Sequence, residues 1–225
     1  GLLNALHQMN RDYIPLEALA EEACDVEINK LEKPIGKQDQ YMAAFGGLTV
    51  LDIQTDGTVN VKGADVSDST IGDLNRNLLM FYTNTSRSAD SILAEQSRGA
   101  REEKDCVVDS MHYIKEIGYK VLEAVESGNI TDVGLLFDQH WRHKKRITTK
   151  MSNSRFDNIY EIAKENGALG GKISGAGGGG FFLFYVEKQH GSFREKMKEL
   201  GLREMRYRFD FEGTKVLVNF MDGTV

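Results

Sequence analysis

Residues 172–186 read KISGAGGGGFFLFYV, a glycine-rich loop followed at once by a run of aromatic and aliphatic residues. Gly175, Gly177 and Gly180 satisfy the pattern G-x-G-x-x-G of dinucleotide-binding loops. That function requires a strand before the loop and a helix after it, whereas residues 181–186 predict a strand. The stretch therefore indicates a glycine turn leading into a buried strand, and it argues against a dinucleotide-binding fold.

The glycines need a physical reason, because each one costs backbone entropy on folding. One reason is the close approach of a phosphate, whose oxygens the backbone N–H groups of such a loop can bind. The other is a tight turn between strands, in which glycines only relieve crowding. The glycines alone leave both interpretations open, and the sequence contains no G-x-x-x-x-G-K-[ST] phosphate loop.

Composition narrows the class of protein. The 225 residues carry 28 Lys+Arg and 34 Asp+Glu, a formal charge of −6, which argues against a general nucleic-acid-binding protein. No apolar run approaches the roughly 18 residues of a membrane helix. Cys24 and Cys106 lie far apart and outside any C-x-x-C pair, so we expect neither a disulfide framework nor a zinc site. We expect a cytoplasmic protein with small-molecule ligands and no nucleic-acid or membrane partner, and a homodimer is left open.

The order of the predicted elements favours an α+β fold. Helical periodicity runs from Pro15 to the turn at 34–36, and Asp56-Gly57 predicts a hairpin between strands 48–53 and 58–61. Residues 65–73 are polar and predict a connector. The remaining predicted elements are a buried strand at 78–82, helices over 89–150 with a break at Gly118 or at 127–129, a capped helix at 154–166, a helix at 192–200, and strands at 205–209 and 215–220.

Several motifs point to one family. The stretch 172–181 resembles the third signature of the GHMP kinases, a superfamily that includes galactokinase, homoserine kinase, mevalonate kinase and phosphomevalonate kinase. Gly36-Lys37-Gln38-Asp39-Gln40 resembles that superfamily's catalytic-aspartate segment. Further stretches resemble the branch that phosphorylates a heptose 7-phosphate at its anomeric oxygen, for nucleotide-activated heptose synthesis: 82–89, 141–145, 152–153 and 209–213.

The resemblance implies a GHMP-kinase-like α+β architecture. Residues 1–68 would be the remainder of an N-terminal ATP-binding domain, and residues 69–225 a C-terminal domain whose antiparallel sheet is covered by helices. The first two signatures of the superfamily lie upstream of the resembling stretch, and Leu2, Leu3 and Leu6 already follow a helical pattern. We therefore expect residues to precede Gly1, and we expect this chain alone to bind ATP poorly.

The resemblance also implies site residues and cofactors. Asp39 would be the base that orients or deprotonates the attacking hydroxyl, and Glu27 would bind Mg²⁺, the partner of ATP. The alternatives are that Asp39 caps a helix and that Glu27 lies on a solvated helix face. The remaining implied residues are Ser174, Gly175, Ala176, Gly177 and Gly178 for ATP, and Gly36, Lys37, Gln38, Thr83, Asn84 and Arg87 for the sugar phosphate. For Arg87 the alternative is a salt bridge to Asp90.

A second group of residues has no family role. His140 and His143 flank Trp141, and without a third ligand we expect the two histidines on a helix surface and Trp141 in the core. The basic run 144–146 predicts a solvated face, with an anionic pocket as the alternative. Lys172 is expected to pair with nearby acids or with phosphate.

Two other functions compete with the heptose 7-phosphate kinase. One is a kinase for galactose, fucose or another sugar. The other is a non-catalytic relative that binds a sugar or nucleotide; Asp39 and Glu27 favour the enzyme, since a sensor needs no base.

Overall fold

The computed structural model describes residues 1–85, 89–102, 105–175 and 177–218, and the chain forms two compact units. The first comprises Gly1–Ala64 together with the tail that begins at Phe209, and the second comprises Asp65–Arg208. The predicted boundary at 68/69 differs from this division by four residues and by the placement of the tail.

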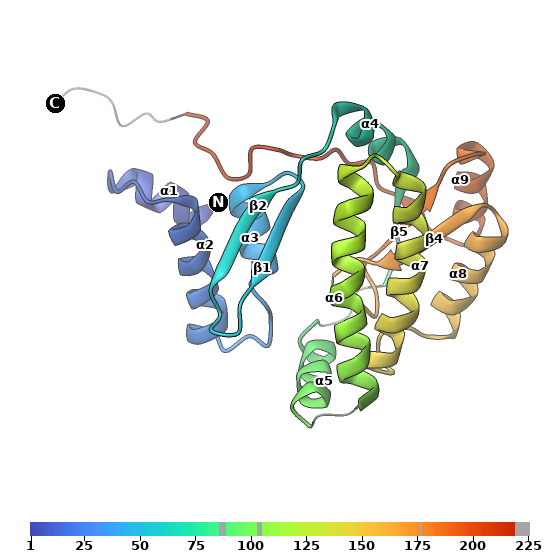
Figure 1. Cartoon of the computed structure of the whole chain (residues 1–225), viewed down its shortest axis with the longest axis horizontal. Coiled ribbons are helices and arrows are strands. Elements are labelled where there is room, and N and C mark those ends of the chain that lie inside the picture. Colours follow the sequence, from blue (N-terminus) through green and yellow to red (C-terminus); the bar gives the residue numbers. More distant parts are fainter. Residues whose placement is uncertain (86–88, 103–104, 176, 219–225) are drawn as a thin grey trace. The chain divides into compact units, whose positions relative to one another are not determined.

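The first unit combines helices with one hairpin (Figure 1). Its strands pair antiparallel, with Leu51 opposite Val61, and Gly57 adopts the left-handed conformation (φ +87°) that the predicted turn requires. The elements are α1 (Leu2–Met9), α2 (Leu16–Cys24), a π-helical segment (Asp25–Lys30), α3 (Gln38–Phe45), β1 (Thr49–Ile53) and β2 (Val59–Gly63).

The core of this unit is small. Ala20, Cys24, Tyr41 and Ala44 are buried between α2 and α3, and the hairpin packs against them. The C-terminal tail crosses the end of α3, where a Cβ on Gly213 would lie 2.2 Å from the carbonyl oxygen of Ala44. The tail therefore contacts the first unit as an irregular segment, and the predicted strand at 215–220 is wrong over its described part, 215–218.

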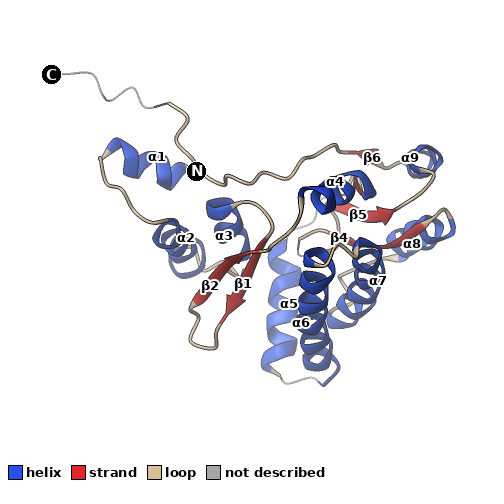
Figure 2. Ribbon diagram, turned by 45° about the horizontal axis from the view of Figure 1, so that its top comes forward, coloured by secondary structure: helices blue, strands red, loops and turns tan. Residues whose placement is uncertain are grey.

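The second unit is built on a four-stranded antiparallel sheet of order β4-β5-β3-β6, with helices packed against it (Figure 2). Lys172 lies opposite Leu183, and Leu183 lies opposite Met80, so these three residues share one face. The strands are β3 (Leu78–Tyr82), β4 (Ala168–Ile173), β5 (Phe181–Val186) and β6 (Arg203–Glu204). The helices are α4 (Asp68–Asn77), α5 (Ala89–Arg101), α6 (Asp105–Glu126), α7 (Ile130–Ile147), α8 (Ser154–Glu165) and α9 (His190–Glu199).

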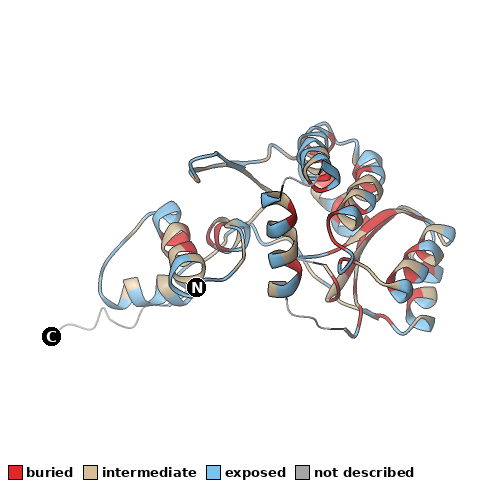
Figure 3. Ribbon diagram, turned by 90° about the horizontal axis from the view of Figure 1, so that it is seen from below, coloured by how far each residue is buried: buried red, intermediate tan, exposed pale blue. Residues whose placement is uncertain are grey.

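Aromatic packing dominates the second unit. Phe182 and Phe184 are fully buried, and their rings stack with centroids 5.0 Å apart. Trp141 is also fully buried and meets Phe182 edge-on, which confirms its predicted place in the core. Figure 3 shows the buried positions concentrated on the strands and on the inner sides of the helices.

Small residues let α7 lie directly against β4. A Cβ on Gly170 would lie 2.0 Å from the carbonyl oxygen of Gly134, so any side chain there would push the helix away. This packing places the C-terminal half of α7 beside the last residues of β4, just before the glycine loop.

Two further predictions need correction, and a third is confirmed. Residues 65–73 are no simple connector: α4 starts at Asp68, and the Ser67 hydroxyl accepts a capping bond from the Thr70 N–H at 3.2 Å. The predicted strand at 205–209 is absent from the described residues, since β6 ends at Glu204. The predicted break at Gly118 or at 127–129 is confirmed at the second position: Gly118 lies inside α6, which ends at Glu126, and α7 starts at Ile130.

Candidate functional site

The glycine loop is fixed by the protein's own backbone. The N–H of Ser174 donates to the carbonyl of Phe181 (2.8 Å), that of Gly178 to Met151 (3.0 Å), and that of Gly180 to Thr85 (2.8 Å). These three N–H groups are therefore already used. Gly175, Gly177, Gly178 and Gly180 all have positive φ, which only glycine adopts readily.

Close contacts explain some of the glycines. A Cβ on Gly177 would lie 2.0 Å from the Met151 sulfur, and one on Gly179 would lie 2.7 Å from the carbonyl oxygen of Thr85. Crowding within the protein is therefore part of the reason for this composition. Ser174 and Gly175 are exposed, so this end of the loop can meet a ligand. Ala176 lies outside the described residues.

The end of β3 supports the loop. Thr83 is fully buried, and its hydroxyl donates to the carbonyl of Gly180 at 3.0 Å. Asn84 is exposed and donates from its amide to the carbonyl of Gly201 at 2.7 Å. Arg155 donates to the carbonyl of Thr83 at 2.9 Å. Thr83 thus holds the loop in place, whereas Asn84 presents a face to solvent. Arg87 lies outside the described residues.

The two histidines of α7 are not on an open surface, which corrects the prediction. The Nδ1 atoms of His140 and His143 are both buried, and neither has a hydrogen-bond partner among the described residues. His143 stacks on Tyr113 with ring centroids 3.8 Å apart. Burial lowers the pKa of His140 to about 3, assisted by the charges of Lys172 and Lys144.

In the first unit, Asp39 lies in the first turn of α3. The residue at the helix N-cap is Lys37, without a side-chain capping bond, so Asp39 does not act as the cap. Asp39 is exposed, and among the described residues its carboxylate has neither a hydrogen bond nor an ion pair. Such a carboxylate is available to accept a proton from a bound hydroxyl.

Lys37 anchors the turn that presents Asp39. Its ammonium donates to both carboxylate oxygens of Glu21 (2.7 and 2.8 Å) and to the carbonyl of Gly57 (2.8 Å). These bonds join α2, the β1–β2 turn and the start of α3. Gly36 and Gln38 on either side are exposed, and a Cβ on Gly36 would meet nothing within 4 Å.

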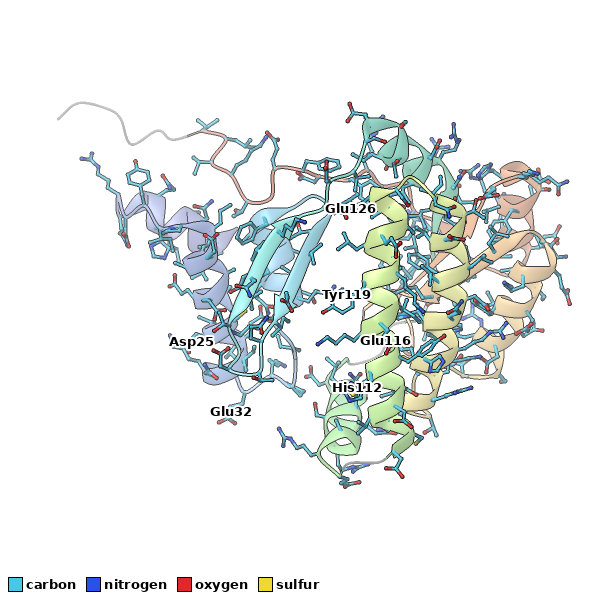
Figure 4. All side chains as sticks on the ribbon, in the orientation of Figure 1. Asp25, Glu32, His112, Glu116, Tyr119 and Glu126 are labelled. Atoms are coloured by element: carbon cyan, nitrogen blue, oxygen red, sulfur yellow. The ribbon has the colours of Figure 1, made fainter. Side chains whose placement is uncertain are left out.

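Glu27 lies in the π-helical segment, a type of distortion often found at functional sites. Asp25 at its start and Glu32 just beyond its end are labelled in Figure 4. The Glu27 carboxylate accepts a hydrogen bond from the side-chain amide of Gln40 at 3.1 Å, and Gln40 directly follows Asp39. The buried Gln40 Oε1 has no partner among the described residues.

These oxygens fit a magnesium ion. Mg²⁺ uses one or two carboxylates and fills its other positions with phosphate oxygens and water. Glu27 supplies one carboxylate, and the unpartnered amide oxygen of Gln40 is a second hard donor nearby. Among the residues that the structure describes, no group of three or more His, Cys, Asp or Glu side chains could hold a metal without such outside ligands.

The sequence reasoning missed Glu21 and Tyr41. The Tyr41 hydroxyl donates to Glu21, and Lys37 and Tyr41 together lower the pKa of Glu21 although burial opposes them by raising it. Glu21 and Lys37 are 16 residues apart across an irregular turn, so no helical spacing rule links them. Tyr41 is buried, and a buried tyrosine hydroxyl needs a partner, but its burial is visible only in the structure.

Comparison with known proteins identifies the family. Residues 121–202, from α6 through the glycine loop to α9, match the family described as GHMP kinases C terminal. The chain belongs to the GHMP kinase superfamily. The predicted GHMP-kinase-like α+β fold is thereby confirmed, with its antiparallel sheet and covering helices.

Two curated GHMP kinases and one solved structure illustrate the relationship. D-glycero-alpha-D-manno-heptose 7-phosphate kinase of Campylobacter jejuni is 32% identical over 88% of this chain and 57% of its own length. Galactokinase of Pyrococcus furiosus is 30% identical over 99% of this chain and 66% of its own length. The galactose complex of Lactococcus lactis galactokinase shares the fold, with a TM-score of 0.71 at 17% identity over 94% of this chain and 64% of that one.

The chain thus spans a little over half to two thirds of these relatives. Within its described part, no helix combines the length and apolar character needed to cross a lipid bilayer.

Proposed function

We propose that the whole protein is an ATP-dependent sugar kinase that phosphorylates the anomeric hydroxyl of a heptose 7-phosphate and works in the cytoplasm. The observation that carries this proposal is the exposed, unpaired Asp39 carboxylate on a turn held by Lys37 and Glu21. The similarity to a heptose 7-phosphate kinase over 88% of the chain supports the choice of substrate.

Asp39 would act on the attacking group. Phosphoryl transfer asks little covalent chemistry of the protein beyond positioning, charge stabilisation and orientation of the nucleophile. The Asp39 carboxylate accepts the proton of the anomeric hydroxyl while the hydroxyl oxygen forms a bond to the γ-phosphorus of ATP. The bond from that phosphorus to the β–γ bridging oxygen breaks, and ADP leaves.

The other predicted residues would bind and orient. Glu27, with Gln40 beside it, would hold Mg²⁺, which neutralises phosphate charge when bound. The exposed end of the glycine loop would contact ATP, with the loop held by Thr83 and Met151. The residues we assign to ATP are Ser174, Gly175, Ala176, Gly177 and Gly178. Those we assign to the sugar phosphate are Gly36, Gln38, Asn84 and Arg87, while Lys37 and the buried Thr83 would position them.

The test uses the protein with all residues that precede and follow this chain in its gene. Phosphorus NMR should show a new anomeric phosphate when heptose 7-phosphate and MgATP are supplied. Asp39→Asn should lower kcat by about 10²–10⁴-fold with the fold retained, the usual size of a general-base contribution. Asp52→Asn, another exposed aspartate of the same unit, is the matched control and should turn over normally. Normal turnover by Asp39→Asn would remove the base assignment.

A galactose or fucose kinase is the second candidate. Similarity to the P. furiosus galactokinase favours it, as does similarity to the L-fucokinase/L-fucose-1-P guanylyltransferase of Bacteroides fragilis, 28% identical over 49% of this chain and 11% of its own length. Comparing kcat/KM for heptose 7-phosphate, galactose and fucose in the same assay distinguishes the candidates. Binding of a sugar without turnover of any of them would instead indicate the non-catalytic relative.

A further inference from the structure

Two lysines and a histidine gather beside the glycine loop in the second unit. Lys144 in the last turn of α7 donates to the carbonyl of Gly175 at 2.6 Å. His140 lies one helical turn earlier on the same face. Lys172, the fifth residue of β4, places its ammonium 5.8 Å from the ring centroid of Phe137, which lies one further turn back on α7.

The charges of this cluster are poorly solvated. Burial lowers the pKa of Lys172, and burial together with the charge of Lys172 lowers the pKa of Lys144 to about 8. The same two lysines help to lower the pKa of His140, so all three groups lie within electrostatic reach of one another. Two ammonium groups that share a partly buried site are unfavourable unless an opposite charge joins them.

The described part of the protein supplies no such charge. Lys145, the neighbour of Lys144, pairs with Asp157 at 2.9 Å, and Arg142 pairs with Asp138 at 2.9 Å. Neither Lys144 nor Lys172 has an ion pair among the described residues. Lys145 is therefore neutralised by α8, whereas Lys144 of α7 and Lys172 of β4 have no acidic partner among the described residues.

We propose that Lys144, Lys172 and His140 form a phosphate-binding site at the exposed end of the glycine loop. A phosphate monoester carries about −1.5 to −2 charges at neutral pH, which matches two ammonium groups. Lys144 keeps two N–H donors after its bond to Gly175, and Lys172 has three. The unpartnered Nδ1 of His140, in the tautomer that carries its proton there, is a further donor.

This inference deepens the proposed function. Only the identity of the phosphate-bearing ligand rests on that function, and the binding site itself does not. A sugar phosphate and a nucleotide both carry the required group. The site itself can be tested with inorganic phosphate on the 225-residue chain, without turnover.

The experiment measures thermal unfolding of the chain in rising inorganic phosphate, with sodium chloride at equal ionic strength as the blank. A ligand that binds only the folded state raises Tm, and the rise grows with the logarithm of the ligand concentration above its Kd. Phosphate should raise the Tm of the wild-type chain, and Lys172→Met and Lys144→Met should each weaken the apparent affinity by about tenfold or more. In phosphate-free buffer Lys172→Met should have a higher Tm than wild type, because it removes a poorly solvated charge.

Lys198→Met is the matched control, since it removes the same charge from an exposed position of α9. It should keep the full phosphate response, which separates specific binding from general salt effects. The proposal is overturned if wild type shows no phosphate response beyond chloride, or if Lys172→Met and Lys144→Met respond as wild type does. It is also overturned if Lys172→Met lowers Tm in phosphate-free buffer, because the lysine would then be a structural group.

Two further ligands identify the source of the phosphate. If mannose 6-phosphate raises Tm in a Lys172-dependent way and ADP does not, the site takes the phosphate of a sugar; the reverse result assigns it to the nucleotide. Failure of both to respond, with free phosphate also inactive, overturns the site. Absence of sugar-kinase turnover in the longer protein would overturn the proposed function alone and leave a phosphate response unaffected.

Discussion

The two units present opposite charge at their candidate sites. In the first unit, Glu27 and Asp39 are carboxylates, and Lys37, at the turn that presents Asp39, is neutralised by Glu21. In the second unit, Lys144 and Lys172 approach the glycine loop without an acidic partner among the described residues. Phosphoryl transfer needs a group that handles the hydroxyl proton and the metal, and other groups that bind phosphate. In the kinase that we propose, the carboxylates of the first unit would meet the first requirement, and the lysines of the second unit would meet the other.

The units also differ in how their sites are held. The second rests on a large aromatic core that includes Phe182, Phe184 and Trp141. The first has a core made chiefly of alanine, cysteine and one tyrosine, and polar bonds from Lys37 hold its site. We therefore expect packing changes to damage the second unit most, and hydrogen-bond changes to act mainly in the first.

Phe182→Ala should have the largest effect on stability. Its ring is fully buried between Trp141, Phe156 and Phe184, so the substitution should cost about 3–5 kcal/mol in the free energy of unfolding. Urea denaturation measures this cost. Tyr119→Ala on the exposed face of α6 (Figure 4), where the side chain is 56% exposed, should stay within about 0.5 kcal/mol of wild type. Equal losses from both variants would contradict the aromatic core as the support of the second unit.

Gly177→Ala should destabilise the glycine loop by about 1–3 kcal/mol, because alanine at φ +99° is strained and its Cβ would overlap the Met151 sulfur. Gly118→Ala should change the free energy of unfolding in the opposite direction. Gly118 lies exposed in the middle of α6 with nothing within 4 Å of its Cβ, so alanine should stabilise by about 0.5–1 kcal/mol. Thermal unfolding of the two variants tests both expectations. If Gly177→Ala left the stability unchanged, Met151 would have to move aside freely.

His140 should make the second unit sensitive to acid. Its pKa falls from 6.5 to about 3 on folding, so between these values the unfolded chain binds the proton and the folded chain does not. The contribution of neutral His140 is therefore complete above pH 6.5, and it is lost as pH falls, by at most about 1.4 kcal/mol per pH unit. Urea midpoints at pH 7 and pH 5 should differ less for His140→Gln than for wild type. His112→Gln on the exposed face of α6 should leave the difference unchanged (Figure 4).

Local signals predicted much of the fold. The Asp56-Gly57 turn, the strand at 78–82 and the capped helix at 154–166 each depend on a few adjacent residues, and the structure confirms all three, with Asn153 as the cap of α8. The predictions that were wrong involve packing between distant residues. The polar sequence at 65–73 predicted a connector, but α4 forms there and buries Leu74. The tail beyond 205 has strand-like residues but forms no strand over its described part.

The candidate site shows the same limit. The motifs pointed to Asp39, Glu27 and the glycine loop, but their partners come from other elements. Glu21 reaches Lys37 across a turn, and Lys172 of β4 meets α7 only because Gly134 and Gly170 allow the two backbones to approach. The desolvated charge of Lys172 depends on tertiary packing, and the helix and strand periodicities in the sequence do not predict such packing.

Tyr41→Phe should have the smallest effect, and it tests whether polar bonds or packing hold the site of the first unit. The buried ring remains in place, so the change removes only the hydroxyl that donates to Glu21. Glu21 keeps both bonds from Lys37, and its partly exposed carboxylate can accept water in place of the hydroxyl. We expect a loss of about 1 kcal/mol in the free energy of unfolding. Because Lys37 still anchors the turn before Asp39, kcat/KM of the longer protein should change by less than about threefold, a difference of under about 0.7 kcal/mol. Tyr13→Phe, at a ring that is 73% exposed, is the matched control and should change neither quantity. A loss of activity comparable to that of Asp39→Asn would show instead that the Tyr41 hydroxyl, through Glu21, sets the position of the catalytic turn.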